Sequence, residues 1–229
     1  EKYQTYSALV KAHLTSTGGD AGSALARMQD VAAAMRDTII ARLDDPRDDL
    51  ISLLWTVKID GQPTTQQDIE NYGVLMFIAG LDTVMQGMGH GVRHMAMHPE
   101  LQSELRANPA LIADATEELL RRYTFTVPPR RLNKDVVFEG VQMKKADLDP
   151  KEFPDAARVE LNRGGKPHIA FNAGPHRCLG SHLARVELNI LYEEVLARMP
   201  LFRLDPERPA TFSGGHIIGV QELHLVWDK

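Results

Sequence analysis

A single cysteine, Cys178, is the residue whose chemistry most constrains the function of this chain. It lies in the segment Phe171-Asn-Ala-Gly174-Pro-His176-Arg-Cys178-Leu-Gly180. A lone thiol forms no internal disulfide, and a zinc site would normally need several cysteine and histidine ligands at short spacing. The remaining roles are a free buried thiol, a nucleophile, or the single thiolate ligand of a large cofactor.

The residues around the cysteine favour the cofactor ligand. Gly174 can supply unusual backbone angles for a tight turn, and Gly180 lets a flat cofactor approach the backbone closely. A helix is expected at residues 181–199, directly after the cysteine, and its free amide groups and dipole would stabilise a thiolate there. The competing interpretation is an inert cysteine in the core, because buried free cysteines are common.

A second pattern, Ala79-Gly80-Leu81-Asp82-Thr83, lies in a long helix expected at residues 65–98. A glycine inside a helix costs about 1 kcal/mol relative to alanine, so Gly80 needs an explanation. Beside the small alanine it would open a groove on the helix face, and Thr83 could bond back to a carbonyl and loosen the turn. Asp82 places a titratable acid beside that hydroxyl. The alternative is a core helix with a polar kink.

The composition is that of an ordinary globular protein. Hydrophobic residues make up 43% and charged residues 25% of the 229 positions, enough for one core, so residues 1–229 are expected to form a single domain. The net charge of -5 argues against a nucleic-acid partner. One cysteine fits a reducing compartment, and no apolar run reaches membrane-spanning length, so we expect a cytoplasmic protein with no membrane contact.

The periodicity of the chain predicts a mainly α fold with small antiparallel β-sheets. An Asp-Gly pair at residues 60–61 indicates a hairpin tip. Two-residue alternation predicts strands at residues 130–145 and in the tail at 214–227. Ala184, Leu188, Leu191 and Val195 would form one apolar face of the helix at 181–199. Further helices are expected at residues 6–14, 22–43, 49–55, 99–107 and 109–123.

The cysteine segment resembles the haem-binding signature of the cytochrome P450 family, which reads Phe, two residues, Gly, three residues, Cys, one residue, Gly. The resemblance implies haem b, with the Cys178 thiolate as axial ligand of its iron and Phe171, Gly174 and Gly180 shaping the loop. His176 matches a position that binds a haem propionate. Asn172 departs from the pattern, because the family usually has a second glycine there, and this is expected to alter the turn while leaving the ligand in place.

The helix pattern resembles the oxygen-activation helix of the same family. The resemblance implies that Thr83 positions dioxygen, that Asp82 serves proton delivery, and that Ala79 and Gly80 face the cofactor.

Two further motifs carry the resemblance. Glu118 and Arg121 stand three residues apart and resemble the Glu-x-x-Arg motif, whose buried pair is structural; as a plain solvated pair they would mean little. Arg130 matches an arginine that binds a haem propionate, and arginine suits carboxylates because its donors form a bidentate pair. The alternative for Arg130 is an exposed basic turn. Arg177 and Arg185 could face an acidic redox partner or could equally be solvated charges.

Six mostly aliphatic residues match positions that face the substrate in the camphor-hydroxylating bacterial branch, which the chain resembles most. Their alternative is ordinary core packing. Such side chains would suit a small apolar substrate, for example a terpenoid. The six are Leu75, Ile78, Thr126, Val127, Ile217 and Ile218.

The resemblance extends from the long helix to Trp227. The N-terminal helices of the family have no counterpart, and Asp147 is followed directly by Leu148 where the family has an intervening strand. We therefore expect the C-terminal part of a cytochrome P450 catalytic domain, either truncated or joined across gaps.

The resemblance implies a haem-thiolate monooxygenase that hydroxylates its substrate with dioxygen. Two electrons would come from an iron–sulfur ferredoxin and its NAD(P)H-dependent reductase, because no flavin or nicotinamide site is visible. One alternative is a haem-thiolate gas sensor without turnover, which would need Cys178 but not the Asp82-Thr83 pair. Another is a helical interaction module with a chance cysteine motif.

Overall fold

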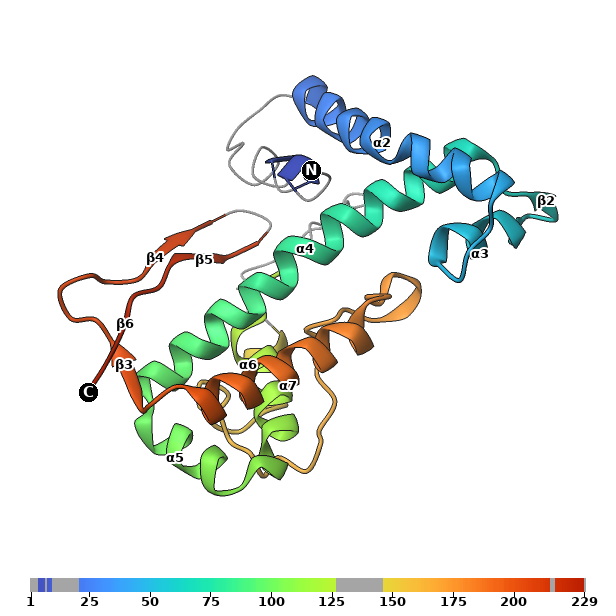
Figure 1. Cartoon of the computed structure of the whole chain (residues 1–229). Coiled ribbons are helices and arrows are strands. Elements are labelled where there is room, and N and C mark those ends of the chain that lie inside the picture. The colour runs from blue at the N-terminus through green and yellow to red at the C-terminus, as the bar shows by residue number, and fades with distance from the viewer. Residues whose placement is uncertain (1–3, 7, 10–20, 127–145, 215–216, 229) are drawn as a thin grey trace. The chain divides into compact units, whose positions relative to one another are not determined.

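The computed structural model describes residues 4–6, 8–9, 21–126, 146–214 and 217–228 (Figure 1). These residues divide between two compact units, 1–82 and 83–229, and helix α4 (Gln66–Met97) contributes to both. The strands expected at 130–145 and most of the helix expected at 6–14 lie outside the described residues. The described elements are mostly helical with two-stranded antiparallel sheets, which confirms the predicted fold class.

The first unit follows its local sequence signals closely. Helix α2 (Ala21–Asp44) is followed by α3 (Leu50–Thr56), and the Asp49 carboxylate caps α3 by accepting from the Ser52 N–H at 2.9 Å. Strands β1 (Lys58–Ile59) and β2 (Gln62–Pro63) form the predicted hairpin. At its tip, Asp60 and Gly61 have φ angles of 50° and 80°, the left-handed conformations that Asp-Gly turns favour.

Helix α4 begins with a reciprocal cap. The Thr65 N–H donates to Asp68 Oδ2 at 2.9 Å, and the Asp68 N–H donates to Thr65 Oγ1 at 3.2 Å. The helix is then α-helical without interruption through all 32 residues. The expectation of a loosened helical turn around Thr83 is therefore wrong, because the backbone keeps its regular helical form there.

The second unit consists of short elements packed around the C-terminal half of α4. Helix α5 (Pro99–Ala107) and the 3-10 turn η1 (Pro109–Leu111) lead into α6 (Ile112–Tyr123), and both proline-led starts are confirmed. The strand-like tail divides between two sheets, in which β3 (Phe202–Leu204) pairs with β6 (Leu225–Trp227) and β4 (Thr211–Ser213) pairs with β5 (Gly219–Glu222). The remaining elements are η2 (Ala146–Leu148), η3 (Gly174–His176) and α7 (Ser181–Arg198).

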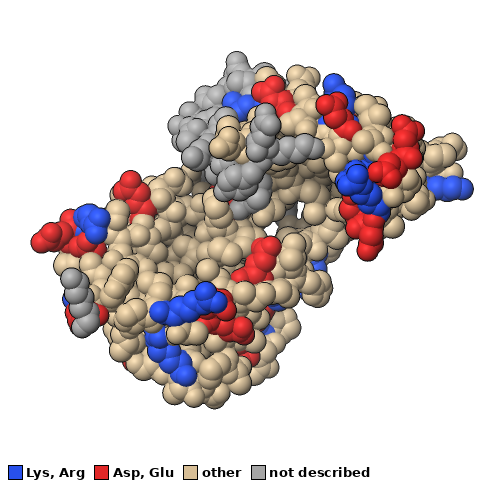
Figure 2. Space-filling model, viewed as in Figure 1, with Lys and Arg blue, Asp and Glu red and all other residues tan. Residues whose placement is uncertain are grey.

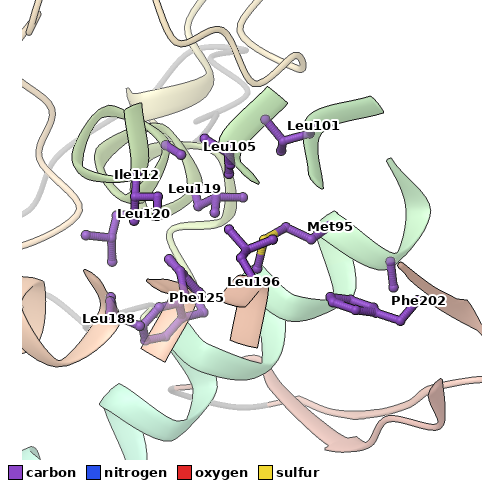
Figure 3. Packing of buried hydrophobic residues seen from close by; sticks show 13 residues of the cluster. Met95, Leu101, Leu105, Ile112, Leu119, Leu120, Phe125, Leu188, Leu196 and Phe202 are labelled. Carbon is purple, nitrogen blue, oxygen red and sulfur yellow. The ribbon is translucent and has the colours of Figure 1, made fainter. Parts of the chain in front are cut away.

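The core of this unit lies where α4, α5, α6, α7 and β3 meet. Figure 3 shows their apolar side chains pointing toward one another, among them Met95 of α4, Leu105 of α5, Leu119 of α6 and Leu196 of α7. All four are almost fully buried. The packing fixes α6 and α7 against each other, and these two helices carry the residues discussed below.

Helix α7 is apolar on more than one side. Leu188 of the predicted apolar face is buried, as is Tyr192 one turn later, but Leu183, Val186 and Ile190 are 60%, 53% and 53% exposed. The helix itself is confirmed, whereas the expectation of a simply amphipathic helix is wrong. Within the part of the chain that the structure describes, no helix has the length and apolar character needed to cross a membrane.

We predict that Gly91→Ala destabilises the protein. A Cβ at Gly91 would overlap the hydroxyl of Tyr192, a buried side chain whose hydroxyl donates to the Gly87 carbonyl at 3.2 Å. Relief of such an overlap in a packed core should cost about 1–3 kcal/mol of unfolding free energy. Denaturant unfolding of the two proteins measures this difference.

The matched control is Gly87→Ala, one turn earlier on the same helix. A Cβ there would lie 3.4 Å from Leu188 and Phe125, which is ordinary van der Waals contact. Because alanine is the better helix former, this variant should be unchanged or more stable by up to about 1 kcal/mol. Equal stability of the two variants would contradict the packing described here.

Candidate functional site

The cysteine loop is held by its own backbone. The Cys178 N–H donates to the Phe171 carbonyl at 2.9 Å, and the Arg177 N–H donates to the Gly174 carbonyl at 3.0 Å. The thiol of Cys178 is exposed in the described chain. This exposure does not fit an inert cysteine buried in the core, whereas it fits a thiolate that must reach a bound cofactor.

Left-handed backbone conformations shape this loop. Gly174 has a φ of 70°, as its type predicted, and no described atom lies within 4 Å of the Cβ that it lacks. Asn172 has a φ of 64°, and its Oδ1 accepts from the Ala173 N–H at 2.9 Å. Asparagine tolerates this conformation better than most residues. Asn172 therefore keeps the backbone form that glycine would favour, and the expected alteration of the turn does not follow.

An ion pair joins α6 to α7 directly behind the loop. The Arg185 guanidinium donates to Glu117 Oε1 at 2.5 Å and to Oε2 at 2.9 Å, and its Cζ lies 4.6 Å from the ring centroid of Phe171. The hydrogen bond to Glu117 raises the pKa of Arg185, and the nearby Cys178 contributes in the same direction. Arg185 is thus ion-paired within the described chain and is not a merely solvated charge, whereas its contact with a redox partner stays a prediction.

Glu117 receives a second partner from the extended segment before the loop. The ring Nε2 of His168 lies 3.0 Å from Glu117 Oε2, and His168 is almost buried. Burial by itself would raise the pKa of Glu117, but the hydrogen bonds with His168 and Arg185 outweigh it and lower that pKa to about 2. Sequence reasoning missed Glu117 and His168, because the partners of Glu117 lie 51 and 68 residues away.

The neighbouring pair, Glu118 and Arg121, is buried as the motif predicted. Arg121 is 1% exposed and donates to Glu118 Oε1 at 2.7 Å and to Oε2 at 3.0 Å. The same guanidinium also donates to the carbonyls of Asp147, Ala156 and Arg158 at 2.8–2.9 Å. One guanidinium therefore fixes three points of the segment that leads to the cysteine loop.

Arg163 completes this network and was not anticipated. It donates from Nε to Glu118 Oε2 at 2.9 Å, and the Glu160 N–H reaches the same oxygen at 3.0 Å. Burial would raise the pKa of Glu118, yet the hydrogen bonds from Arg121, Glu160 and Arg163 lower it. The charge of the carboxylate is thus stabilised in the core by directed donors.

The predicted pocket residues of the second unit come together in part. Thr126 and Ile217 form an antiparallel bridge, and the Ile218 N–H donates to the Phe125 carbonyl at 2.8 Å. Val127 and Arg130 lie outside the described residues. His176 is exposed at the end of η3, and Gly180 precedes α7 with open space where a Cβ would stand.

The remaining predicted residues lie at and before the junction of the two units on α4. Leu75 is 59% exposed, and no described atom lies within 4 Å of the Cβ that Gly80 lacks. Asp82 is 8% exposed, so its carboxyl group lies within the protein, and Thr83 is half-buried. Ile78 is half-buried and Ala79 exposed. Ala79 and Gly80 thus have open space beside them while Asp82 is buried, and their contact with a cofactor stays a prediction.

Charges of both signs alternate on the surface. On the face shown in Figure 2, basic and acidic side chains stand next to each other on each unit rather than gathering by sign. Ion pairs of the described residues include Arg47 with Asp45 at 3.2 Å and Arg203 with Asp228 at 3.1 Å.

The donor set around Cys178 fits a cofactor that takes a single protein ligand. Among the described residues, no three His, Cys, Asp or Glu side chains are grouped as a metal ion would require. The exposed thiol stands in a loop whose glycines, Gly174 and Gly180, leave open space on their faces. Haem bound through one thiolate is compatible with both observations.

Comparison with known proteins agrees with this fit. A family model described as Cytochrome P450 matches residues 110–215. A probable cytochrome P450 127A1 of Sinorhizobium fredii is 35% identical over 219 residues, covering 91% of this chain and 53% of that protein. The mycinamicin IV hydroxylase/epoxidase of Micromonospora griseorubida is 33% identical over 210 residues, covering 85% of this chain and 53% of the relative.

Solved structures give the same result. The structure of CYP105P1 in complex with filipin I superposes with a TM-score of 0.86 at 29% identity, covering 99% of this chain and 60% of that chain. CYP101J2 superposes with a TM-score of 0.80 at 30% identity, covering 89% and 54%. The chain spans about half the length of the curated relatives it matches. The more specific placement in the camphor-hydroxylating branch stays a prediction.

We predict that Arg121→Ala destabilises the protein far more than the same change at the next position. Removal of a buried guanidinium leaves Glu118 with an uncompensated charge and three carbonyls without this donor, which should cost about 3–5 kcal/mol. Arg122 is the control, since it is more exposed and makes one hydrogen bond, to the Ala157 carbonyl; its replacement should cost about 1 kcal/mol or less. Equal losses in denaturant unfolding would contradict the buried network.

The lowered pKa of Glu117 predicts a specific acid dependence of stability. Because the pKa is below its unfolded value of 4.5, the stabilising contribution is present above about pH 4.5 and is lost as the pH falls toward 2. The difference in unfolding free energy between the wild type and Glu117→Gln should thus be constant near neutral pH and shrink between pH 4.5 and 2. Unfolding curves across this range measure it, and a difference that grows with acidity would refute the assignment.

Proposed function

The chain belongs to the cytochrome P450 family, and we propose that it forms the C-terminal, cysteine-bearing part of the catalytic domain of a haem-thiolate monooxygenase. The observation that carries the proposal is the Cys178 loop, an exposed thiol held by backbone hydrogen bonds and backed by the Arg185–Glu117 pair. The names of several relatives, including a hydroxylase/epoxidase and a steroid C26-monooxygenase, support an oxygenase activity.

Haem would be held by residues of the cysteine loop together with residues of α4 and Arg130. Cys178 would supply the axial thiolate, with Phe171, Gly174 and Gly180 shaping the loop and His176 and Arg130 reaching the propionates. Ala79 and Gly80 would leave room on the helix face. When bound, haem supplies redox-active iron, and thiolate ligation favours cleavage of dioxygen.

Asp82 would deliver protons, and Thr83 would position dioxygen. They are consecutive residues of a regular helix, so their side chains project about 100° apart. Thr83 would hold dioxygen through its hydroxyl, while the largely buried Asp82 would pass protons inward from solvent. The division is reasonable because a hydroxyl can donate and accept at once, whereas a carboxyl group can store a proton.

The substrate and partners follow from the same proposal. The aliphatic side chains at Leu75, Ile78, Ile217 and Ile218 suit a small apolar substrate such as a terpenoid. Electrons would come from an iron–sulfur ferredoxin with its NAD(P)H-dependent reductase, in a cytoplasmic setting. The net charge of -5 is the reason to propose no nucleic-acid partner.

The experiment uses the full-length protein that contains these residues. Reduction in the presence of carbon monoxide should give the shifted Soret band typical of thiolate-ligated haem, and Cys178→Ser should abolish that shift. Thr83→Ala should keep the band but lower product per NAD(P)H consumed by about tenfold or more, because proton delivery is no longer directed. The substrate for this assay is the small terpenoid that gives the largest low- to high-spin change.

The outcomes separate the candidate functions. A wild type without the thiolate-type band would refute both the monooxygenase and a gas-binding haem protein. A normal band without any substrate turnover would favour the gas sensor. Full coupling in Thr83→Ala would refute the proposed role of Thr83 in oxygen activation while leaving the role of Cys178 in place.

A further inference from the structure

The terminal hairpin joins the predicted pocket wall through its backbone. Ile217 pairs with Thr126, and the Ile218 N–H donates to the Phe125 carbonyl at 2.8 Å. The strand that follows, β5, places Val220 against α4. The position of Ile217 therefore depends on how the segment 217–220 is held.

Two buried side chains of α4 hold that segment. Gln86 Oε1 accepts from the Val220 N–H at 2.7 Å, and the Nε2–H of His90 donates to the Ile218 carbonyl at 2.8 Å. Both side chains are 6% exposed and lie four residues apart, one helical turn. The His90 ring also stacks on Tyr123, with centroids 5.0 Å apart, which restricts its movement.

Glycines bring the hairpin close enough for these bonds. A Cβ at Gly219 would lie 2.9 Å from Gln86 Oε1, and a Cβ at Gly89 would lie 3.1 Å from the Val220 Cβ. A shift of the hairpin by one residue would break both bonds to α4 and turn each side chain to the opposite face. The contacts thus define one register of the hairpin.

We propose that Gln86 and His90 are positioning residues that fix Ile217 relative to the Thr83 turn of α4 and thereby set the size of substrate that the site accepts. Gln86 follows Thr83 by three residues and so lies on the same side of the helix. Helix α4 then positions both the segment that carries Ile217 and the Thr83 hydroxyl that is proposed to hold dioxygen. This inference rests on the proposed monooxygenase function, because it concerns the substrate side of that site.

The test compares two nitrogen ligands of haem iron in the full-length, haem-loaded protein. Imidazole is small and reports the integrity of the iron site, whereas 4-phenylimidazole also requires room and contacts along the pocket wall. In Gln86→Leu and in His90→Phe, which keeps an aromatic ring, imidazole affinity should stay within about twofold. The ratio of the 4-phenylimidazole Kd to the imidazole Kd should rise about fivefold or more, the effect of about one lost hydrogen bond.

Conservative variants and amide exchange separate positioning from general damage. Gln86→Glu retains an acceptor oxygen and should keep the wild-type ratio, and Gln86→Met replaces Gln86→Leu in case the latter does not fold. Hydrogen exchange at the Ile218 and Val220 amides, measured without any ligand, should be faster by about fivefold in the leucine and phenylalanine variants.

Three results would overturn the proposal. Unchanged amide exchange would show that the two side chains do not hold the hairpin. Faster exchange with an unchanged affinity ratio would show that the hairpin register does not set substrate size. A wild type that takes up no thiolate-ligated haem would refute the proposed function itself, and the exchange measurement would still report on the hairpin contacts separately.

Discussion

The buried guanidinium of Arg121 is the constraint on which the cysteine-bearing unit depends. The described segment after η2 runs to α7 with only the short η3 turn as regular structure, so its backbone groups need partners other than their own helix or sheet. Arg121 supplies donors to two of its carbonyls, those of Ala156 and Arg158, and to the Asp147 carbonyl within η2, while Glu118 balances the charge of the guanidinium and accepts from the Glu160 N–H. This exchange of hydrogen bonds fixes the described segment between η2 and Glu160 against α6.

Helix α6 serves as the template for the whole region because two adjacent carboxylates act in different directions. Glu118 holds the irregular segment through Arg121 and Arg163, while Glu117 holds α7 and the loop through Arg185 and His168. Consecutive residues on a helix point about 100° apart, so one short stretch can address both sides. Arg185, which is bound to α6, also stacks on Phe171, and the Phe171 carbonyl accepts from the Cys178 N–H. The position of α6 therefore helps to fix the cysteine loop.

Local signals in the sequence predicted most of the described elements. The Asp60-Gly61 turn, the Thr65–Asp68 cap and the prolines that begin α5 and η1 act over a few residues, so their outcome depends little on the rest of the fold. The long-range partners could not be read this way. Gln86 and His90 bond backbone groups 134 and 128 residues away, and nothing in their neighbouring sequence marks that role. The exposure of Ile190 could not be predicted either, because α7 carries apolar residues on its exposed side as well as on its buried side.

Three anchors of this unit, Arg121, Gln86 and His90, share one property, in that each bonds backbone groups of a segment distant in the sequence. Arg121 donates to carbonyls, Gln86 accepts from an amide and His90 donates to a carbonyl, so each contact persists whatever side chain its partner carries. The side chains of the hairpin and of the segment before the cysteine are therefore free to vary without loss of these bonds. Under the proposed function, specificity can change at positions such as Ile217, because the register of the hairpin is set by bonds to α4.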